Sequence, residues 1–148
     1  MITQEIKFIK LDEKATVPSY GTEFSAGADL YALPGQEIEL NPNETTLVHT
    51  GIAMEIPEGF AGFVFARSGI ATKRGLAPAN KVGVIDSDYR GEIMVALHNH
   101  SDKIQKVEDN ERVAQLVIMP YLRAEFTEAE TLEDTKRASG GFGSTGTK

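Results

Sequence analysis

Gln36–Leu40, QEIEL, alternates polar with apolar residues, and Ile93–Leu97, IMVAL, is an apolar run in a segment rich in strand-forming residues. Successive side chains of a β-strand point to opposite faces, so this period predicts strands with one face in a core. Other segments rich in Val, Ile, Phe and Thr give the same prediction. The predicted strands include Ile6–Leu11, Glu37–Leu40, Thr45–Ile56, Gly62–Phe65, Glu92–Asn99 and Arg112–Pro120.

Turn-forming residues separate these segments. Pro34-Gly35, Asn41-Pro42-Asn43 and Pro57-Glu58-Gly59 interrupt the apolar runs. Only Ser68–Arg74 reads as a short helix. Many short strands at close spacing are typical of an all-β sandwich or barrel. No internal repeat or linker divides the sequence, so we expect one domain.

The composition narrows the function classes. No apolar run approaches the roughly 20 residues that cross a bilayer, and Met1–Glu5 lacks the basic patch and apolar stretch of a signal peptide. The sequence contains no cysteine, which excludes disulfides and thiolate metal sites, so we expect a cytoplasmic protein. A net charge of −7 argues against nucleic-acid binding. A triphosphate site in such a protein must concentrate a few cations or borrow a metal ion.

The C-terminal segment has a different composition. From Ala138 to Lys148 the residues are almost all Gly, Ser and Thr, around a single Phe142. Such a segment buries too little surface to offset its ordering entropy, so we expect it to be mobile without a ligand. A plain flexible tail is one interpretation. A lid that closes on phosphates is the other, because glycines allow close backbone approach and the ring offers a stacking face.

Two polar sites follow strand signals in the first half of the chain. Asp29 lies in the apolar run Ala26–Leu30, where it could cap a turn or hold Mg²⁺ through its water shell. Arg67 and Ser68 stand between a hydrophobic strand and the predicted helix. Backbone N–H groups point outward at such a place, so these residues could bind an anion, although Ser68 could also be an ordinary helix cap.

The most informative stretch is Gly83–Gly91, GVIDSDYRG. Strands on both sides of an acidic turn predict a β-hairpin. Asp86 could be a structural turn acid, or a general base that orients an attacking water at the edge of an apolar pocket. Tyr89 could be a surface aromatic or a platform for a sugar.

Gln115 is the one polar residue in the apolar part of the predicted strand Arg112–Pro120, and it could bond to the backbone or to a ligand. The histidines His49, His98 and His100 form no convincing cluster, although His98 and His100 could share a strand face.

Together these stretches resemble, in order, the five motifs of the trimeric deoxyuridine triphosphatase family. Asp29 lies in the stretch similar to the first motif, and Arg67-Ser68-Gly69 resembles the second. Gly83–Gly91 is the most distinctive match, to the third. The fourth and fifth resemblances are carried by Arg112–Leu116 and Arg137–Gly146.

The resemblance implies a single-domain, jelly-roll-like β-barrel with one short helix, assembled as a homotrimer with shared active sites. It implies hydrolysis of dUTP to dUMP and pyrophosphate with Mg²⁺, which limits uracil in DNA and supplies dUMP for thymidylate synthesis. The barrel would span residues 1–136, with a flexible lid over residues 137–148. Neither nucleic acid nor membrane would be a partner.

The resemblance also implies residue roles. Asp86 would activate the attacking water, with Gln115 and Arg67 as further catalytic groups, and Asp29 would orient Mg²⁺ through bound waters. Tyr89 would pack on the deoxyribose and exclude a 2′-hydroxyl. The uracil pocket would be formed by Asn80, Val84, Ile85 and Met94, with Phe142 as its cover. The phosphate contacts would come from Arg67, Ser68, Gly69, Gln115, Arg137, Gly143, Ser144 and Thr145.

The sequence departs from the family pattern at two positions. Ala66 stands where the second motif usually begins with proline, so the turn before Arg67 is less constrained. Ala138 follows Arg137 where glycine is usual, and alanine would be strained there if the position needs positive φ.

Two other functions compete with this interpretation. A deoxycytidine triphosphate deaminase of related fold needs an acid beside the cytosine ring, and no suitable acid stands out here. A non-catalytic nucleotide- or protein-binding module would use the same scaffold, but binding alone needs no water-orienting acid such as Asp86.

Overall fold

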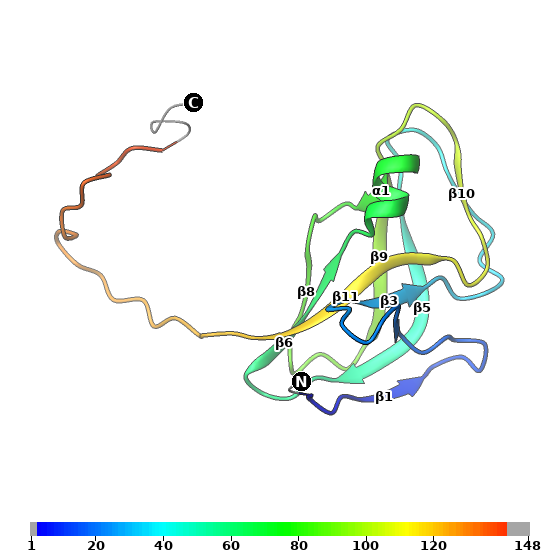
Figure 1. Cartoon of the computed structure of the whole chain (residues 1–148), viewed down its shortest axis with the longest axis horizontal. Coiled ribbons are helices and arrows are strands. Elements are labelled where there is room, and N and C mark those ends of the chain that lie inside the picture. The colour runs from blue at the N-terminus through cyan, green and yellow to red at the C-terminus, as the bar shows by residue number, and fades with distance from the viewer. Residues whose placement is uncertain (1–2, 142–148) are drawn as a thin grey trace.

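The structure of the protein is a computed structural model that describes residues 3–141. Eleven strands and one short helix form there (Figure 1). The elements are β1 (Lys7–Lys10), β2 (Ser19–Tyr20), β3 (Ala28–Tyr31), β4 (Ile38–Leu40), β5 (Thr45–Glu55), β6 (Phe60–Phe65), α1 (Ser68–Arg74), β7 (Leu76–Pro78), β8 (Gly83–Ile85), β9 (Glu92–Asn99), β10 (Gln105–Val107) and β11 (Arg112–Pro120).

The strands form two main antiparallel sheets. One has the order β1-β5-β9-β7, and the other has the order β2-β3-β11-β6-β8. A two-stranded sheet of β10 and β4 completes the set. The chain is therefore a mostly-β single domain, as its sequence predicts.

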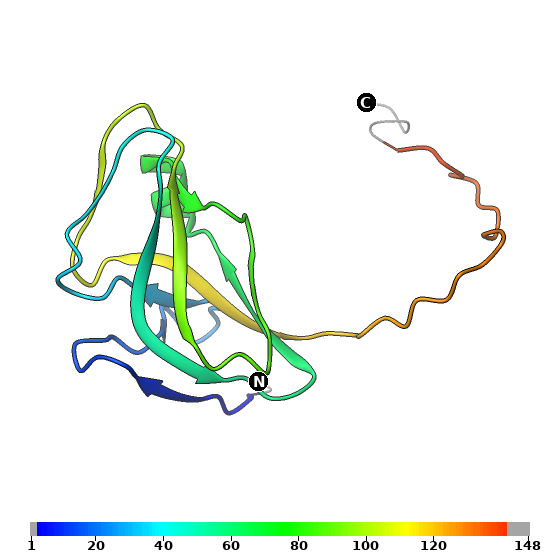
Figure 2. The same ribbon diagram turned by 180° about the vertical axis from the view of Figure 1, so that it is seen from behind.

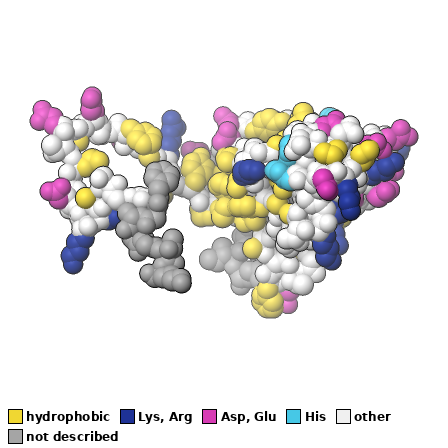
Figure 3. Space-filling view, turned by 90° about the horizontal axis from the view of Figure 1, so that it is seen from above, with side chains coloured by type: hydrophobic (Ala, Val, Ile, Leu, Met, Phe, Trp, Pro, Cys, Tyr) yellow, Lys and Arg dark blue, Asp and Glu magenta, His cyan; other side chains and the backbone are white. Residues whose placement is uncertain are grey.

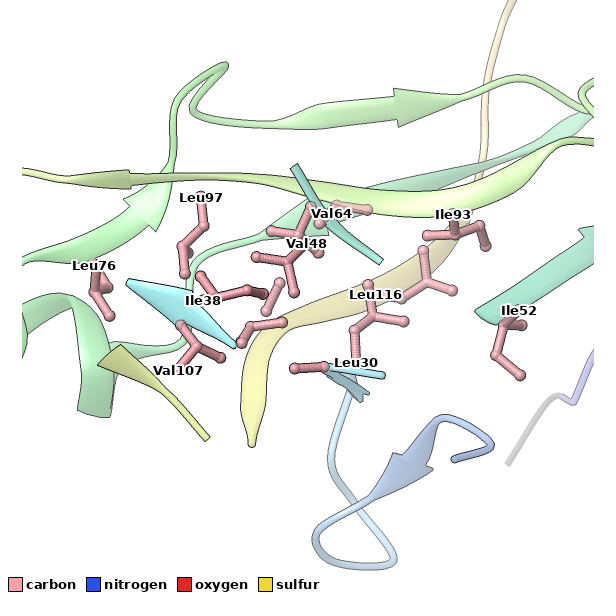
Figure 4. Packing of buried hydrophobic residues seen from close by; sticks show 14 of the residues in the cluster. Leu30, Ile38, Val48, Ile52, Val64, Leu76, Ile93, Leu97, Val107 and Leu116 are labelled. Carbon is pink, nitrogen blue, oxygen red and sulfur yellow. The ribbon is translucent and has the colours of Figure 1, made fainter. Parts of the chain in front are cut away.

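The core is built from the alternating inward residues of both sheets (Figure 4). On β9 the side chains of Ile93, Val95 and Leu97 are buried, while those of Met94 and Ala96 are not. Leu30 and Leu116 supply the facing apolar groups from the second sheet. Buried and less buried side chains therefore alternate along β9, as expected for a strand with one face in the core.

The helix α1 spans Ser68–Arg74, as predicted. Gly75 ends it with a left-handed φ of 68°, and its N–H donates to the carbonyl of Ala71. A side chain at Gly75 would come within 2.9 Å of the backbone nitrogen of Ser101, so only glycine fits. The helix is thus held at the end of β6 and beside the start of β7.

The predicted hairpin around Gly83–Gly91 is wrong. The strand β8 pairs with β6, Ile85 lying opposite Gly62, whereas β9 pairs with β5 and β7. A hairpin would require β8 to pair along the edge of β9 that β5 does not occupy. Near the end of β9 this edge is paired with β7, and the N–H of Ala79 extends the pairing by donating to the carbonyl of Ala96. The turn after β8 therefore connects two different sheets.

The segment 121–141 leaves the body after Pro120 and contains no strand or helix (Figures 1 and 2). Its apolar side chains Leu122, Phe126 and Leu132 are almost fully exposed. Hydrophobic side chains also gather on the part of the body that faces this arm (Figure 3). Among the described residues, no helix has the length and apolar character needed to cross a membrane.

Asn99 gives a stability prediction. It is fully buried, and its amide donates to the carbonyls of Leu40 and Lys103 while its oxygen accepts from Ser101. Asn99→Asp keeps the shape but sets a carboxylate oxygen against two carbonyls. We expect the free energy of unfolding to fall by about 2–4 kcal/mol, measured by urea denaturation at fixed protein concentration. Gln4→Glu, the same change at an exposed site, is the control, and equal stabilities would contradict this assignment.

Candidate active site

A polar pocket of about 400 Å³, here called the arginine pocket, opens where β3, β11 and the turn before α1 meet. Asp29 on β3 lies directly opposite Gln115 on β11, so their side chains share one face of the sheet. The neighbouring strand β6 leads into Arg67, Ser68 and Gly69. The lining residues are Gly21, Ser25, Ala26, Gly27, Asp29, Arg67, Ser68, Gly69, Arg112 and Gln115.

Two arginines share the Asp29 carboxylate. The Nε of Arg67 donates to Oδ1 at 2.6 Å, and a terminal nitrogen of Arg112 donates to Oδ2 at 3.2 Å. The Asp29 side chain is only 13% exposed, so this carboxylate is stabilised by its two charged donors. Two guanidinium groups and one carboxylate leave the cluster with a charge of +1 in a protein of net charge −7.

Gln115 is held from two sides. Its amide nitrogen donates to the carbonyl of Ala66 at 2.9 Å. A Cβ at Gly27 would lie 2.5 Å from its Oε1, so the side chain rests directly on the glycine backbone. Because Ala66 supplies only a carbonyl, the absence of the usual proline at that position leaves this contact intact.

Arg112 was not predicted as a site residue, although it begins the stretch that resembles the fourth motif. Residues three apart on a regular strand point to opposite faces. Here the pairing of β11 with β3 slips between Arg112 and Ala114, with Arg112 opposite Tyr31 and Ala114 opposite Leu30. This bulge inserts one residue and turns Arg112 to the same side as Gln115. No signal in the sequence marks the bulge.

A metal ion finds no complete protein site here. Among residues 3–141, no three His, Cys, Asp or Glu side chains lie close enough to hold one. Both oxygens of Asp29 already accept hydrogen bonds from arginines. Asp29 is therefore not placed to coordinate a metal ion directly, and it could contact one only through a water molecule.

His98 on β9 and His100 just after it lie together. Within residues 3–141 they belong to no group of three or more side chains that could hold a metal ion. The rings of His98 and His100 are 4.3 Å apart between centroids. Slight desolvation, together with the charges of the neighbouring His98 and Lys81, lowers the pKa of the exposed His100. Nδ1 of His98 is hydrogen-bonded to the Thr45 hydroxyl, which agrees with their interpretation as ordinary residues.

A second, smaller pocket of about 140 Å³ lies between β8 and β9, here called the β8–β9 pocket. It exists because these strands diverge into different sheets. It brings together Asn80, Val84, Ile85 and Met94, the four residues predicted to share a pocket. At Gly83 a Cβ would lie 3.2 Å from the amide nitrogen of Asn80, so a glycine lets that amide approach the strand.

Asp86 and Tyr89 lie on the turn after β8. Asp86 is exposed in an open cleft that also contains Glu58, Arg90 and Arg123. The Tyr89 ring lies on Gly91, and its hydroxyl donates to the carbonyl of Glu92 at 2.9 Å. The ring is therefore fixed while one face stays accessible, since the residue is 43% exposed.

The arginine pocket and the Asp86 turn are far apart within one chain. Gln115 lies opposite Phe65, and Ile85 lies opposite Gly62 on the other side of β6. At about 4.8 Å per strand and 3.4 Å per residue, the Cα atoms of Gln115 and Ile85 are about 14 Å apart. Asp86 continues away from Gln115, so the chain does not bring these two side chains together.

Arg137 lies on the exposed arm, with its Nε donating to the carbonyl of Gly140. Ala138 has a left-handed φ of 44°, the conformation that alanine adopts with strain. The remaining predicted lid residues, Phe142, Gly143, Ser144 and Thr145, lie outside the described residues.

Comparison with known proteins gives one consistent result. The family model described as dUTPase matches residues 13–146. The deoxyuridine 5'-triphosphate nucleotidohydrolase of Desulfitobacterium hafniense is 47% identical over 146 residues, covering 98% of this chain and 97% of that protein. The corresponding protein of Hydrogenobaculum sp. is 48% identical, covering 94% and 96%. The solved Staphylococcus bacteriophage 80alpha dUTPase with dUpNHpp is 27% identical, with a TM-score of 0.88 over 97% of this chain and 99% of that chain.

The contact between Gly27 and Gln115 gives a prediction about the arginine pocket. Gly27→Ala places a Cβ where Oε1 of Gln115 lies, so Gln115 must leave its position. We expect pyrophosphate binding, measured by titration calorimetry, to weaken about tenfold through the lost polar contact. Thr3→Ala, at an exposed position that does not line the arginine pocket, serves as the control. Equal affinities in wild type and Gly27→Ala would show that Gln115 does not contribute to anion binding.

Proposed function

Because this chain belongs to the dUTPase family, we propose that the arginine pocket binds the phosphates of dUTP and the β8–β9 pocket binds its uracil. The chain is a dUTP diphosphatase, a nucleotide hydrolase that acts on dUTP. The observation that carries the assignment of the sites is the meeting of Arg67, Ser68, Gly69 and Gln115 in one cationic pocket. Guanidinium and amide donors suit phosphate oxygens.

Base selectivity rests on β8 being an edge strand. The backbone groups along one edge of β8 pair with β6, and those along its other edge face the β8–β9 pocket. Backbone groups at Val84 and Ile85, with the Asn80 amide, read the polar edge of uracil. Cytosine presents a donor where uracil has an acceptor, and leaving that pair unmatched is costly in a desolvated pocket. Met94 lines the apolar side.

Tyr89 acts as the sugar gate. Its ring is pinned on Gly91 and its hydroxyl is bonded to the backbone, so it cannot retreat freely from the sugar. A deoxyribose packs on the exposed face of the ring, whereas a ribose brings a 2′-hydroxyl into contact with it. The enzyme therefore prefers dUTP to UTP.

Hydrolysis follows from a water held by Asp86. The carboxylate takes a proton from the water as the oxygen of that water attacks the α-phosphorus. The bond from the α-phosphorus to the oxygen bridging the α- and β-phosphates breaks, and pyrophosphate leaves with dUMP as the other product. Arg67 and Gln115 hold the α-phosphate, and their charge and hydrogen bonds favour the transition state.

Mg²⁺ is the metal that we assign to the reaction. When bound, it neutralises phosphate charge and holds the leaving group. Because Asp29 is committed to Arg67 and Arg112, it would hold the ion only through bound water, and the triphosphate would supply the ion's main ligands. The arginines supply the rest of the positive charge within an acidic protein.

One active site needs more than one subunit. The separation of about 14 Å between Ile85 and Gln115 is too large for Asp86 and Gln115 to act on one α-phosphate in a single chain. A homotrimer, in which Asp86 and the β8–β9 pocket of one subunit meet the arginine pocket of another, resolves this. The arm from Pro120 to Arg137 can span up to about 55 Å when extended, enough to reach a neighbour.

The proposed function also includes a C-terminal lid and a role in the cell. Residues 1–136 form the body with the first part of the arm, and residues 137–148 form the lid, with Phe142 over the uracil and Arg137, Gly143, Ser144 and Thr145 on the phosphates. In the cytoplasm the reaction limits uracil in DNA and supplies dUMP for thymidylate synthesis.

A panel of nucleotides separates this function from its rivals. The purified protein is incubated with Mg²⁺ and dUTP, UTP, dCTP or dTTP, and pyrophosphate and ammonia are assayed. Pyrophosphate from dUTP alone is expected. Ammonia from dCTP would instead identify a deaminase, and no product from any nucleotide would favour a binding module.

Asp86→Asn tests the water-activating role. We expect turnover to fall at least about a hundredfold, because the amide cannot accept the proton. Binding of dUpNHpp should stay within about threefold, since the amide keeps the carboxylate's shape. Asp102→Asn, at an exposed loop position away from both pockets, is the matched control. Unchanged turnover in Asp86→Asn would remove Asp86 from the mechanism.

Ala138→Gly tests the strain in the arm. Alanine at a φ of 44° costs on the order of 1 kcal/mol relative to glycine. If closure of the lid keeps this conformation, the glycine variant should raise kcat/KM by up to about fivefold, measured at low dUTP. Ala129→Gly, elsewhere on the exposed arm, controls for added flexibility. A lower kcat/KM in Ala138→Gly alone would show that the alanine suits the closed lid.

A further inference from the structure

We propose that Glu92 and His49 position Tyr89, and that this pair of side chains thereby sets how strongly the enzyme rejects a ribose. The inference rests on the proposed function of Tyr89 as the sugar gate. It deepens that function by naming the residues that hold the gate in place. Glu92 and His49 are positioning residues, because they act on the sugar through Tyr89.

The sugar gate is attached to the first residue of β9. The Tyr89 hydroxyl donates to the backbone carbonyl of Glu92 at 2.9 Å. A side chain at Gly91 would clash with the Tyr89 ring, so the ring also rests on the backbone just before Glu92. The position of the ring therefore depends on where the backbone of residues 91–92 lies.

Regular strand pairing holds this backbone only weakly. The strands β5 and β9 pair in register as far as His49 opposite Met94, but the next pair is Ala53 opposite Glu92. Over this stretch β5 has two more residues than β9, which interrupts the ladder of backbone hydrogen bonds beside Glu92. On the other edge of β9, β7 pairs only with residues 97–99. The start of β9 therefore needs other contacts to fix it.

The Glu92 carboxylate supplies those contacts. Its Oε1 accepts from the backbone N–H of Gly51 at 2.7 Å, and its Oε2 accepts from Nδ1 of His49 at 2.8 Å. A carboxylate can only accept, so Nδ1 of His49 carries the hydrogen. The Glu92 side chain is 19% exposed, and hydrogen bonds to a charged acceptor are strong in such a setting. This carboxylate with its two donors on β5 is here called the Glu92 clamp.

The β5 side of the Glu92 clamp is itself well supported. Gly51 has a left-handed φ of 70°, and a Cβ there would lie 2.8 Å from the Cβ of Ala15. The backbone N–H of His49 donates to Oε1 of Gln36 at 2.8 Å, and its carbonyl accepts from Nε2 of Gln36 at 2.9 Å. Glu92 is therefore bound to a part of β5 whose backbone is held by close packing and by further hydrogen bonds.

The test compares dUTP with UTP in variants of the Glu92 clamp. Glu92→Ala removes both acceptors, and His49→Ala removes one donor. Glu92→Gln is the conservative variant, because its oxygen can accept from Gly51 and its amide can donate to the other tautomer of His49. The matched control is Glu44→Ala, which removes a carboxylate that also accepts from a backbone N–H, that of Asn41, near the other end of β5. Release of pyrophosphate in the presence of Mg²⁺ gives kcat/KM for each nucleotide.

A positioning role predicts a change in selectivity. In Glu92→Ala the ratio of kcat/KM for dUTP to kcat/KM for UTP should fall about tenfold or more, because Tyr89 can move away from a 2′-hydroxyl. Most of this change should be a gain with UTP, since kcat/KM for dUTP should fall less than about threefold. His49→Ala should lower the ratio about threefold, whereas Glu92→Gln and Glu44→Ala should keep it within about twofold.

A double variant tests whether Glu92 acts through Tyr89. Tyr89→Phe removes the hydroxyl that bonds to the Glu92 carbonyl. Adding Glu92→Ala to Tyr89→Phe should lower the ratio by less than about threefold, because residues that act as a unit are not additive. A further loss as large as that of Glu92→Ala alone would place its effect elsewhere and overturn the proposal.

A merely structural Glu92 clamp gives a different pattern. Equal changes in kcat/KM for dUTP and UTP, or an unchanged ratio, would overturn the proposal. Urea denaturation checks that each variant is folded, and if Glu92→Ala is not, His49→Ala carries the same test, because its side chain is 50% exposed. Wild-type protein that hydrolyses neither nucleotide, or both equally, would instead overturn the proposed function, so the two failures are distinguishable.

Discussion

The pairing of β11 with β3 on one side and β6 on the other is the constraint on which the site depends. It sets Gln115 opposite Asp29 and places the end of β6, and so Arg67, beside both. The bulge at the start of β11 then adds Arg112 to the same face. Strand register therefore brings a single carboxylate and two guanidinium groups together in the arginine pocket.

Under the proposed function, the same sheet explains why one chain is not enough. The β8–β9 pocket lies at the outer edge of β8, because the next strand in the chain belongs to the other sheet. The arginine pocket lies on the far side of β6. If the first pocket binds the base and the second binds the phosphates, a second copy of the chain supplies the remaining half of each site. The division of the site and its selectivity would then both follow from the position of β8 at the edge of its sheet.

Much of the fold could be predicted from the sequence because its signals are local. Glu92–Asn99 and Ser68–Arg74 form the strand and the helix predicted for them, since strand and helix preferences act over a few residues. The Ser68 cap that the sequence also allowed is wrong, because the N-cap is Arg67 and no side chain caps the helix. The hairpin at Gly83–Gly91 was predicted wrongly because strand pairing is decided by distant competitors, here β6 and β7. Local sequence contains no information about which edge is already occupied.

The candidate site was predictable only in part, for the same reason. Asp29, Arg67 and Gln115 stood out as polar residues in apolar or turn settings, but their assembly into one cluster depends on register. Arg112 was not among the predicted site residues, although it lies in the stretch that resembles the fourth motif, and no residue in the sequence marks the bulge that turns its side chain toward Gln115. For Asp86 the residues left both a structural turn acid and a water-orienting base open, and the resemblance to a family chose the second.

A subunit-mixing experiment tests the central claim most directly. Asp86→Asn and Gln115→Ala subunits, each inactive alone, are unfolded together in equal amounts and refolded, and dUTP hydrolysis is measured. If each site joins the arginine pocket of one chain to Asp86 of another, about a quarter of the sites in randomly mixed trimers contain both intact halves. The account predicts recovery of about that fraction of wild-type activity. Activity no higher than that of the separate variants would contradict it and would return the whole site to a single chain.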